Sequence, residues 1–420
     1  MKIVVTTSTF PVSPSDTVPR FVEDQIKEMV KLDTGLDVHV HTAHHSYCNP
    51  LEDKIERESH TEHRYHYVYP RRLEKLSGRA ILPTLRRNPL YFFLIPNYMW
   101  FQYRSLLKLC RSERPDLLYA HWFMTQAITS YFVSKQLGIP LVFTTHASDV
   151  SVLKKIPLSK YFVAKVLSHS QAYTAVSRRT AAKLEAAVEP ELWEKHFRKK
   201  LDILPMGTYI KPLTTSKKER LETLKQAEIT NDKKIIFCIG RISQKKGFRY
   251  LIDAFSQLDE KQRNIYELVI AGDGELLQDH KAQVKRLNLN KEVVFTGYVQ
   301  GELKEALFAE ADIFILPSII EGGDSEGLPV TLMEALSAKK IVIATNVSGA
   351  EEIIDESSGY LVEQKSSKEI YKAIQSIIAM NKTERNAMIQ AGSNQAKQFD
   401  WRLIAEKHLN LLRKAAELHD

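Results

Sequence analysis

Two glutamates, Glu326 and Glu334, are separated by seven residues and flank the junction between a polar, glycine-rich loop and a predicted helix. The loop follows an apolar stretch, 312–320, that is typical of a buried strand. In open α/β sheets, ligands bind beyond the carboxyl ends of the strands, where free N–H groups at a helix start attract anions. The N–H groups of Gly327 and Leu328 are therefore expected to face a ligand anion. At 1.5 Å per residue the two glutamates lie about 12 Å apart, so one extended ligand with two hydroxyl-bearing ends reaches both.

A second group of residues that could bind an anion follows an apolar strand that begins at Lys234. Gly240, Arg241 and Lys246 come in that order, directly before a predicted helix. A glycine lets the backbone approach a ligand closely, and two cations neutralise phosphate charge. This arrangement suits a diphosphate, and the alternative is that the basic residues are simply solvated, as they usually are in loops. A solvated position is also the alternative for Glu334 taken alone, because glutamates on helices are usually exposed.

The first half of the chain offers two further candidates, each beyond the end of a predicted strand. His146 ends the strand in the stretch 139–149, and Asp16 lies in the loop after the first strand. A lone histidine is equally open to a structural interpretation. The loop that contains Asp16 lacks Gly-x-Gly-x-x-Gly, which argues against a nicotinamide or flavin enzyme.

Taken together, these motifs resemble those of retaining glycosyltransferases of the GT-B fold, in particular family 4. The Glu-x7-Glu segment has Gly-Leu-Pro after its first glutamate, as in that family. Residues 240–247 match Gly-Arg-x-x-x-Lys-Lys-Gly, and residues 144–149 match Thr-x-His-Gly-x-Asp, with Ala147 in place of the glycine. The resemblance covers nearly the whole chain and is strongest from Gly240 to Val362.

The resemblance implies a role for each candidate residue. Glu326 would lie beside the donor sugar, with His146 approaching the same sugar, and Arg241 and Lys246 would hold the diphosphate. Glu334 would bind the ribose of the nucleotide. The implied catalytic residues are Glu326, His146, Arg241 and Lys246, and the implied substrate contacts are Gly240, Gly327, Leu328, Glu334, Val299 near the base, and Asp16 on the acceptor side.

The length of 420 residues predicts two domains, and the alternation of strands and helices predicts that both are α/β. The resemblance implies GT-B architecture, in which two Rossmann-like doubly wound domains face each other across a cleft. We place an acceptor-binding domain at 1–211, a donor-binding domain at 212–400, and a final helix at 401–420 that crosses back to the first domain. Within the first domain we expect a strand at 65–70, a helix at 124–137 and a surface insertion at 189–200.

Composition limits the remaining classes. Three scattered cysteines with no Cys-x-x-Cys argue against a disulfide framework and against a zinc site. No apolar run is long enough to cross a membrane, and the first residues form a strand instead of a signal peptide, so we expect a cytoplasmic protein.

The net charge of +8 is concentrated between Arg64 and Arg114, where eleven basic residues accompany two acidic ones. Such an excess favours an anionic partner: a phosphate-bearing substrate, an anionic lipid surface or a nucleic acid. The same segment holds the aromatic run Tyr91–Phe101, which suits either an interfacial membrane contact or a core-packing helix. The family often acts on lipid-linked acceptors, which is compatible with the first alternative.

The resulting hypothesis is metal-independent transfer of a sugar from a nucleotide-diphosphate donor, with retention of configuration and no cofactor. No Asp-x-Asp pair follows a strand end, so Arg241, Lys246 and the helix start would meet the leaving-group charge. Glu326 could be a nucleophile or an electrostatic anchor, and we favour the anchor. The alternatives are a GT-B sugar-nucleotide epimerase and, outside enzymes, a basic nucleic-acid-binding protein, although no nucleic-acid motif accompanies the charge.

Overall fold

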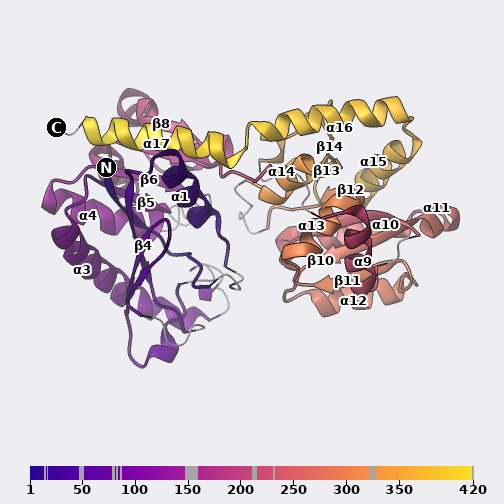
Figure 1. The fold of residues 1–420 in the computed structure, drawn as a ribbon, viewed down its shortest axis with the longest axis horizontal. Coiled ribbons are helices and arrows are strands. Elements are labelled where there is room, and N and C mark those ends of the chain that lie inside the picture. The colour runs from indigo at the N-terminus through magenta and orange to yellow at the C-terminus, as the bar shows by residue number, and fades with distance from the viewer. Residues whose placement is uncertain are drawn as a thin grey trace. The chain divides into compact units, whose positions relative to one another are not determined.

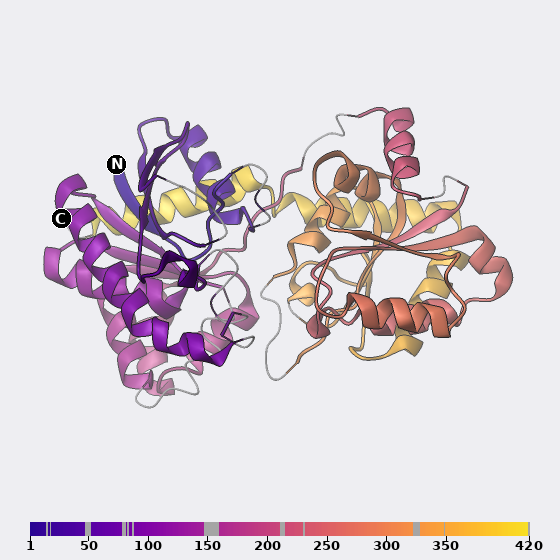
Figure 2. The ribbon, with the colours of Figure 1, turned by 90° about the horizontal axis from the view of Figure 1, so that it is seen from below.

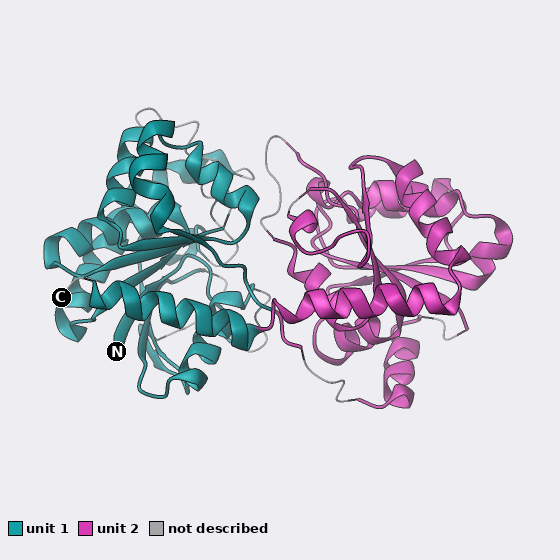
Figure 3. Cartoon of the chain, turned by 90° about the horizontal axis from the view of Figure 1, so that it is seen from above, with its two compact units in different colours: residues 1–207, 401–420 teal, residues 208–400 magenta. Residues whose placement is uncertain are grey.

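The computed structural model describes the chain apart from residues 14–15, 17, 47–51, 78–80, 82–83, 86–87, 147–158, 211–214, 230–231, 322–327, 348 and 419–420. It divides into two compact units (Figure 3), of which unit 1 comprises residues 1–207 with 401–420 and unit 2 comprises residues 208–400. The division follows Gly207, whereas the sequence-based boundary lies at 211–212, inside a gap in the description. The predicted fold class, two α/β domains built on parallel sheets, is confirmed.

Unit 1 is built on a sheet of eight strands in the order β3-β4-β2-β1-β5-β6-β7-β8 (Figure 1). Only the pairing of β3 with β4 is antiparallel among the described strands. The strands are β1 (Lys2–Thr6), β2 (Asp37–Ala43), β3 (Lys54–Glu56), β4 (Thr61–Tyr65), β5 (Leu117–His121), β6 (Leu141–Thr145), β7 (Ala172–Ala175) and β8 (Leu201–Ile203). The central strands read as unbroken apolar runs because a parallel sheet is buried on both faces.

Helices cover both faces of this sheet. They are α1 (Phe21–Leu32), α3 (Ile95–Glu113), α4 (Ile128–Leu137), α6 (Ser159–His169), α7 (Arg178–Glu185), α8 (Pro190–Leu192) and α17 (Trp401–Glu417), with the shorter turns η1 (Arg71–Leu73), η2 (Pro89–Leu94), η3 (Phe123–Ala127), η5 (Trp193–Phe197) and η6 (Arg198–Lys200). The last helix, α17, lies beside α1 in both ribbon views (Figures 1 and 2), and Leu409 and Leu412 share one buried cluster with Ile26 of α1 and Val5 of β1. The end of the chain therefore completes the core of unit 1.

Unit 2 has six parallel strands in the order β11-β10-β9-β12-β13-β14. They are β9 (Lys234–Ile239), β10 (Tyr266–Ala271), β11 (Val293–Gly297), β12 (Ala311–Leu316), β13 (Ile341–Thr345) and β14 (Tyr360–Val362). The helices are α9 (Lys217–Gln226), α10 (Phe248–Ser256), α11 (Glu260–Ile265), α12 (Leu277–Arg286), α13 (Gly301–Glu310), α14 (Val330–Ser337), α15 (Ser367–Ala379) and α16 (Lys382–Lys397), with turns η7 (Gln244–Lys246) and η8 (Ala350–Glu352). Successive residues of β9, Phe237 and Cys238, belong to separate buried clusters, because neighbouring side chains of a strand face opposite sides.

Two local predictions for unit 1 were wrong. The strand expected at 65–70 is instead β4, Thr61–Tyr65, which the apolar pattern missed because Glu62 and Arg64 are polar and pair with each other inside the protein. The helix expected at 124–137 begins at Ile128, since Thr125 has a positive φ of 61°. The stretch 189–200 is largely exposed, as expected of a surface segment, but it places Trp193 in the core of unit 1.

Among the described residues, no helix is both long enough and apolar enough to cross a membrane. The aromatic run that precedes and opens α3 is divided between core and surface. Tyr98 is fully buried, whereas the side chains of Phe92, Phe93 and Trp100 are exposed. This division leaves an apolar surface beside the basic residues of α3.

Candidate active site

The loop after β9 in unit 2 is held against its own strand by a lysine and a glycine. A Cβ placed on Gly240 would lie 2.9 Å from Cε of Lys246, so the lysine side chain runs across the bare backbone of Gly240. The next residue, Gly247, has φ +64°, and a Cβ there would lie 2.0 Å from the carbonyl oxygen of Pro317. The loop 240–247 is therefore fixed between the ends of β9 and β12, with Lys246 at the carboxyl edge of the sheet.

The loop after β10 approaches the same place with bare backbone. Gly272 has φ +136°, and a Cβ on it would come within 1.9 Å of the carbonyl oxygen of Gly240. The N–H of Ile242 donates to the carbonyl oxygen of Asp273 at 2.9 Å. Backbone thus lies against backbone at this edge, which suits a ligand that binds through oxygen atoms to N–H groups and cations.

Arg241 projects from this loop and donates to Glu275, with Nη2 3.3 Å from Oε2. The two side chains are 42% and 49% exposed, so water screens the pair and a phosphate can replace the carboxylate at little cost. Sequence reasoning did not identify Glu275. Its only signal was its place directly after Gly272-Asp-Gly274 at a strand end.

Glu334 lies in α14 and is held through one of its two carboxylate oxygens. Nζ of Lys304 donates to Oε1 at 2.7 Å, and the Glu334 side chain is 25% exposed. The other oxygen, Oε2, is buried and has no hydrogen-bond partner among the described residues. A buried carboxylate oxygen without a donor is costly, so this atom is suited to accept a hydrogen bond from a ligand hydroxyl. This observation favours the binding interpretation of Glu334 over the solvated one.

The remaining candidates of unit 2 divide between described and undescribed residues. Leu328 is partly buried against the core that contains Leu332 and Leu336, as its apolar spacing predicts. Helix α14 begins at Val330, with Pro329 as its N-cap. Glu326 and Gly327 lie outside the described residues.

Val299 follows β11 and stays a prediction for the region of the nucleotide base. Its side chain is buried in the core of unit 2, and the neighbouring Tyr298 is exposed. A ligand at this point would therefore meet the backbone of Val299 and not its side chain.

In unit 1, His146 directly follows β6 and pairs with a second histidine. Its Nε2 lies 3.1 Å from Nδ1 of His121 at the end of β5, and its ring packs on Trp122 and Phe21 with centroids 4.6 and 5.2 Å away. Burial, with a smaller effect of His408, lowers the pKa of His146 to about 3. The imidazole is neutral near pH 7, which suits hydrogen bonding to a sugar and not donation of charge. His121 was missed because only the fold brings β5 beside β6.

A buried polar network supports this histidine pair. The hydroxyl of Tyr119 lies 2.6 Å from Oγ1 of Thr144 and 3.2 Å from Nδ1 of His408 in α17. Oγ1 of Thr144 in turn lies 2.7 Å from that of Thr174. The carboxyl ends of β5 and β6 are thus linked to the last helix of the chain.

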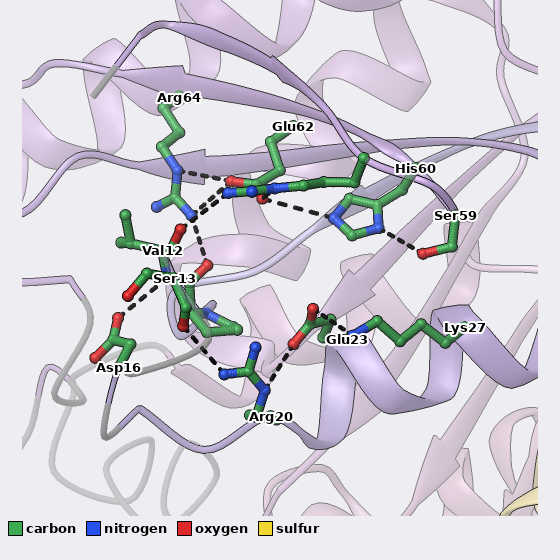
Figure 4. A network of polar contacts seen from close by, with 12 residues as sticks. Val12, Ser13, Asp16, Arg20, Glu23, Lys27, Ser59, His60, Glu62 and Arg64 are labelled. Carbon is green, nitrogen blue, oxygen red and sulfur yellow. Dashed lines mark hydrogen bonds and ion pairs between the residues drawn. The ribbon is translucent and has the colours of Figure 1, made fainter.

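The loop after β1 contains Asp16, whose carboxylate organises the loop itself (Figure 4). One oxygen accepts the N–H group of Val12 at 3.1 Å, as Figure 4 shows. The other oxygen accepts the N–H group of Val18 at 3.2 Å. Arg64 of β4 donates to the carbonyl oxygen of Pro11 at 2.9 Å and so ties the loop to the sheet. Asp16 therefore shapes the edge of unit 1, and its contact with an acceptor stays a prediction.

Glu62 stands behind this loop and is almost fully buried (Figure 4). It accepts hydrogen bonds from Arg57 at 2.8 Å and from Arg64 at 2.7 Å. Burial raises the pKa of Glu62, but the hydrogen bonds and charges of His60, Arg64 and Arg57 outweigh it and bring the value to about 2. The ionised carboxylate thus keeps two arginines in place beneath the loop.

Comparison with known proteins decides the family. The family described as Glycosyl transferases group 1 matches residues 219–395, and Glycosyltransferase Family 4 matches residues 20–192. This chain belongs to the family 4 glycosyltransferases. In this glycosyltransferase the Family 4 match lies within unit 1 and the group 1 match lies within unit 2. The group 1 match includes the Gly240–Gly247 loop and Glu334.

Similar proteins agree with this assignment. TuaC of Bacillus subtilis, which carries the name of a teichuronic acid biosynthesis glycosyltransferase, is 27% identical over 89% of this glycosyltransferase and 88% of TuaC. A GDP-mannose-dependent monoacylated alpha-(1-6)-phosphatidylinositol monomannoside mannosyltransferase of Corynebacterium glutamicum is 26% identical over 66% of this chain and 71% of its own. The structure of Anabaena HepE in complex with UDP-glucose aligns with a TM-score of 0.69 at 17% identity, over 99% of this chain and 100% of that one. That likeness confirms the GT-B fold.

Proposed function

We propose that this glycosyltransferase transfers a sugar from a nucleotide-diphosphate donor to a lipid-linked saccharide, or to another precursor of a polysaccharide or glycoconjugate, with retention of configuration. The unpartnered Oε2 of Glu334 carries the proposal. A ribose hydroxyl is a donor of the kind this oxygen lacks, and Lys246 and Arg241 occupy the loop after β9, where a diphosphate would bind. The likeness to a structure of HepE in complex with UDP-glucose supports a donor of this class.

In this proposal the protein itself neutralises the leaving group. Lys246 and Arg241 meet the charge that develops on the diphosphate as the glycosidic bond breaks, and no metal ion is required. Donors held in place before the reaction are commonly the largest single contribution to catalysis, with one worth roughly 3 kcal/mol. When the donor binds, Arg241 would give up its contact with Glu275 and form one with a phosphate.

At the sugar, Glu326 would be an electrostatic anchor and the neutral His146 a hydrogen-bonding partner. The acceptor hydroxyl would then attack on the face from which the diphosphate leaves, which retains the configuration. A nucleophilic Glu326 that forms a glycosyl-enzyme is the alternative course to the same outcome.

A lipid-linked acceptor and peripheral attachment to the inner face of a cytoplasmic membrane are supported by the surface of α3. Arg104, Lys108 and Arg111 line a hollow of about 600 Å³ together with Trp100 and Phe101. Cations beside exposed aromatic rings suit lipid headgroups and the acyl boundary, respectively. The name of the Corynebacterium glutamicum relative includes a phosphatidylinositol acceptor, which agrees with this reading.

The test is a panel of nucleotide sugars, first ranked by thermal stabilisation of the protein and then supplied with lipid-linked acceptors. We expect one donor to react, free nucleotide to appear only when acceptor is present, and NMR to show the donor's anomeric configuration in the product. Full activity is expected in EDTA. Inversion at the anomeric carbon, or an obligatory Mg²⁺ or Mn²⁺, would overturn the mechanism, and interconversion of donor sugars without acceptor would identify an epimerase.

A further inference from the structure

Two histidines from neighbouring strands of unit 1 meet one aspartate at the edge of the sheet. His44 follows β2 and His66 follows β4, and their rings stack with centroids 3.9 Å apart. Asp53, directly before β3, places Oδ1 2.8 Å from Nε2 of His44 and 3.7 Å from Nε2 of His66. The atoms that could bind a metal lie within 4.8 Å of one another, and no other such group converges among the described residues.

A buried carboxylate sets the protonation of one ring. Both oxygens of Glu74 lie 3.0 Å from Nδ1 of His66, and the Glu74 side chain is 2% exposed. Because an ionised carboxylate only accepts hydrogen bonds, Nδ1 of His66 carries a proton. In the neutral ring Nε2 then holds a lone pair, and this nitrogen lies 3.7 Å from Oδ1 of Asp53.

Oδ1 of Asp53 accepts a hydrogen bond from Nε2 of His44 at 2.8 Å and lies 3.7 Å from Nε2 of His66. A divalent ion that replaces the proton on Nε2 of His44 would use the carboxylate and both imidazoles. A carboxylate behind a metal-bound histidine is the usual outer partner of such a ligand, and Glu74 has that place. Two imidazoles and one carboxylate suit Zn²⁺, with water in the fourth tetrahedral position.

We propose that His44, Asp53 and His66 bind one Zn²⁺ ion, with Glu74 as a positioning residue. The frame of the site is tied together without the ion, since Oγ of Ser77 donates to the carbonyl oxygen of His44 at 2.6 Å. Asp53 and His66 are 75% and 33% exposed, which gives both side chains room to turn toward the ion. The ion would clip the segment before β3 to the ends of β2 and β4, independently of the donor site in unit 2.

The experiment uses the full chain without a polyhistidine tag. Calorimetric titration with Zn²⁺ is expected to give one ion per chain, and Co²⁺ the absorption bands of a tetrahedral site. At a free Zn²⁺ concentration 100 times Kd, the Tm should rise by roughly 5 °C or more. The variants His66→Ala and Asp53→Asn should weaken binding at least ~100-fold, and Glu74→Gln ~10–100-fold.

His196→Ala is the matched control, because it removes an exposed imidazole elsewhere in unit 1 and should leave the affinity unchanged. Circular dichroism of each variant confirms that the fold is retained. Absence of stoichiometric Zn²⁺ binding, or equal binding by His66→Ala and the parent chain, overturns the proposal.

Discussion

At the residue scale, Glu334 combines one satisfied carboxylate oxygen with one unsatisfied oxygen. If it binds a ribose hydroxyl, the contact is the same in the ground state and the transition state. Glu334→Gln should therefore raise the KM for the donor about 10-fold with little change in kcat. Steady-state kinetics with varied donor are the measurement. Glu310→Gln, which loses a carboxylate paired with Arg220 in the same unit, should leave KM unchanged. A fall in kcat at constant KM would place Glu334 at the reacting centre instead.

The cations of the loop after β9 should affect the reaction differently. If Arg241 and Lys246 stabilise charge that develops on the leaving diphosphate, alanine at either position should lower kcat/KM at least ~100-fold. Lys245→Ala is the matched control, because that lysine holds Ile319 through its backbone carbonyl oxygen, which the substitution keeps. Near-normal turnover by the alanine variant of Arg241 or of Lys246 would contradict the proposed diphosphate site.

At the scale of elements, α3 and the turn before it combine exposed aromatic rings with cations. Replacing the three cations Arg104, Lys108 and Arg111 together by Gln should remove the salt-sensitive part of the binding to anionic liposomes. Replacing the three exposed aromatic residues Phe92, Phe93 and Trp100 together by Ser should remove the part of the binding that persists at high salt. Co-sedimentation at low and high salt measures both.

Phe132→Ser is the control for this experiment, because it removes an exposed aromatic ring from α4. Equal binding to neutral and anionic liposomes would contradict the membrane surface and favour a soluble acceptor.

Elements that are buried on both sides could be predicted from the sequence. Strands β9 and β12 read directly as apolar runs, because helices cover both faces of their sheet. Strand β4 could not be predicted in this way. Its buried residues Glu62 and Arg64 are hydrogen-bonded to each other, and these polar side chains interrupt the apolar pattern. The burial of Trp193 was not predicted for a related reason, because its neighbours in the sequence are mostly charged and exposed.

The candidate site was predictable where it follows the chain and not where it depends on folding. Arg241 and Lys246 could be proposed because one loop carries both. Other contacts join separate segments and form only when the chain folds: Glu275 with Arg241, Lys304 with Glu334, and His121 with His146.

At the scale of the whole molecule, buried histidines make stability depend on pH. Burial lowers the pKa of His41 and of His408 to about 3, from an ordinary value near 6.5. Between these values the unfolded chain binds protons that the folded chain does not, so stability is complete above pH 6.5 and falls as the pH decreases toward 3. Each of these residues contributes about 1.4 kcal/mol per pH unit in that window.

Thermal unfolding from pH 7.5 to 4.5 should therefore show a steadily falling Tm below pH 6.5. In the variant His408→Gln, which lacks this titrating ring, Tm should fall less steeply. Its unfolding in this pH range should take up about one proton fewer than that of the parent chain. A Tm that stays constant from pH 7 to pH 5 would contradict the burial of these rings.

Because α17 completes the core of unit 1, that core is assembled out of order during synthesis. Residues 1–207 leave the ribosome first, but Leu409 and Leu412, which cover Ile26 of α1, are made only after all of unit 2. At ordinary rates of translation the delay is roughly 10–40 s. Through that interval the nascent first unit displays an apolar face, while unit 2 is able to fold from a continuous stretch. Cellular chaperones are therefore expected to hold the first half of this chain longer than the second, and a stalled ribosome near residue 400 should leave a product that aggregates through unit 1.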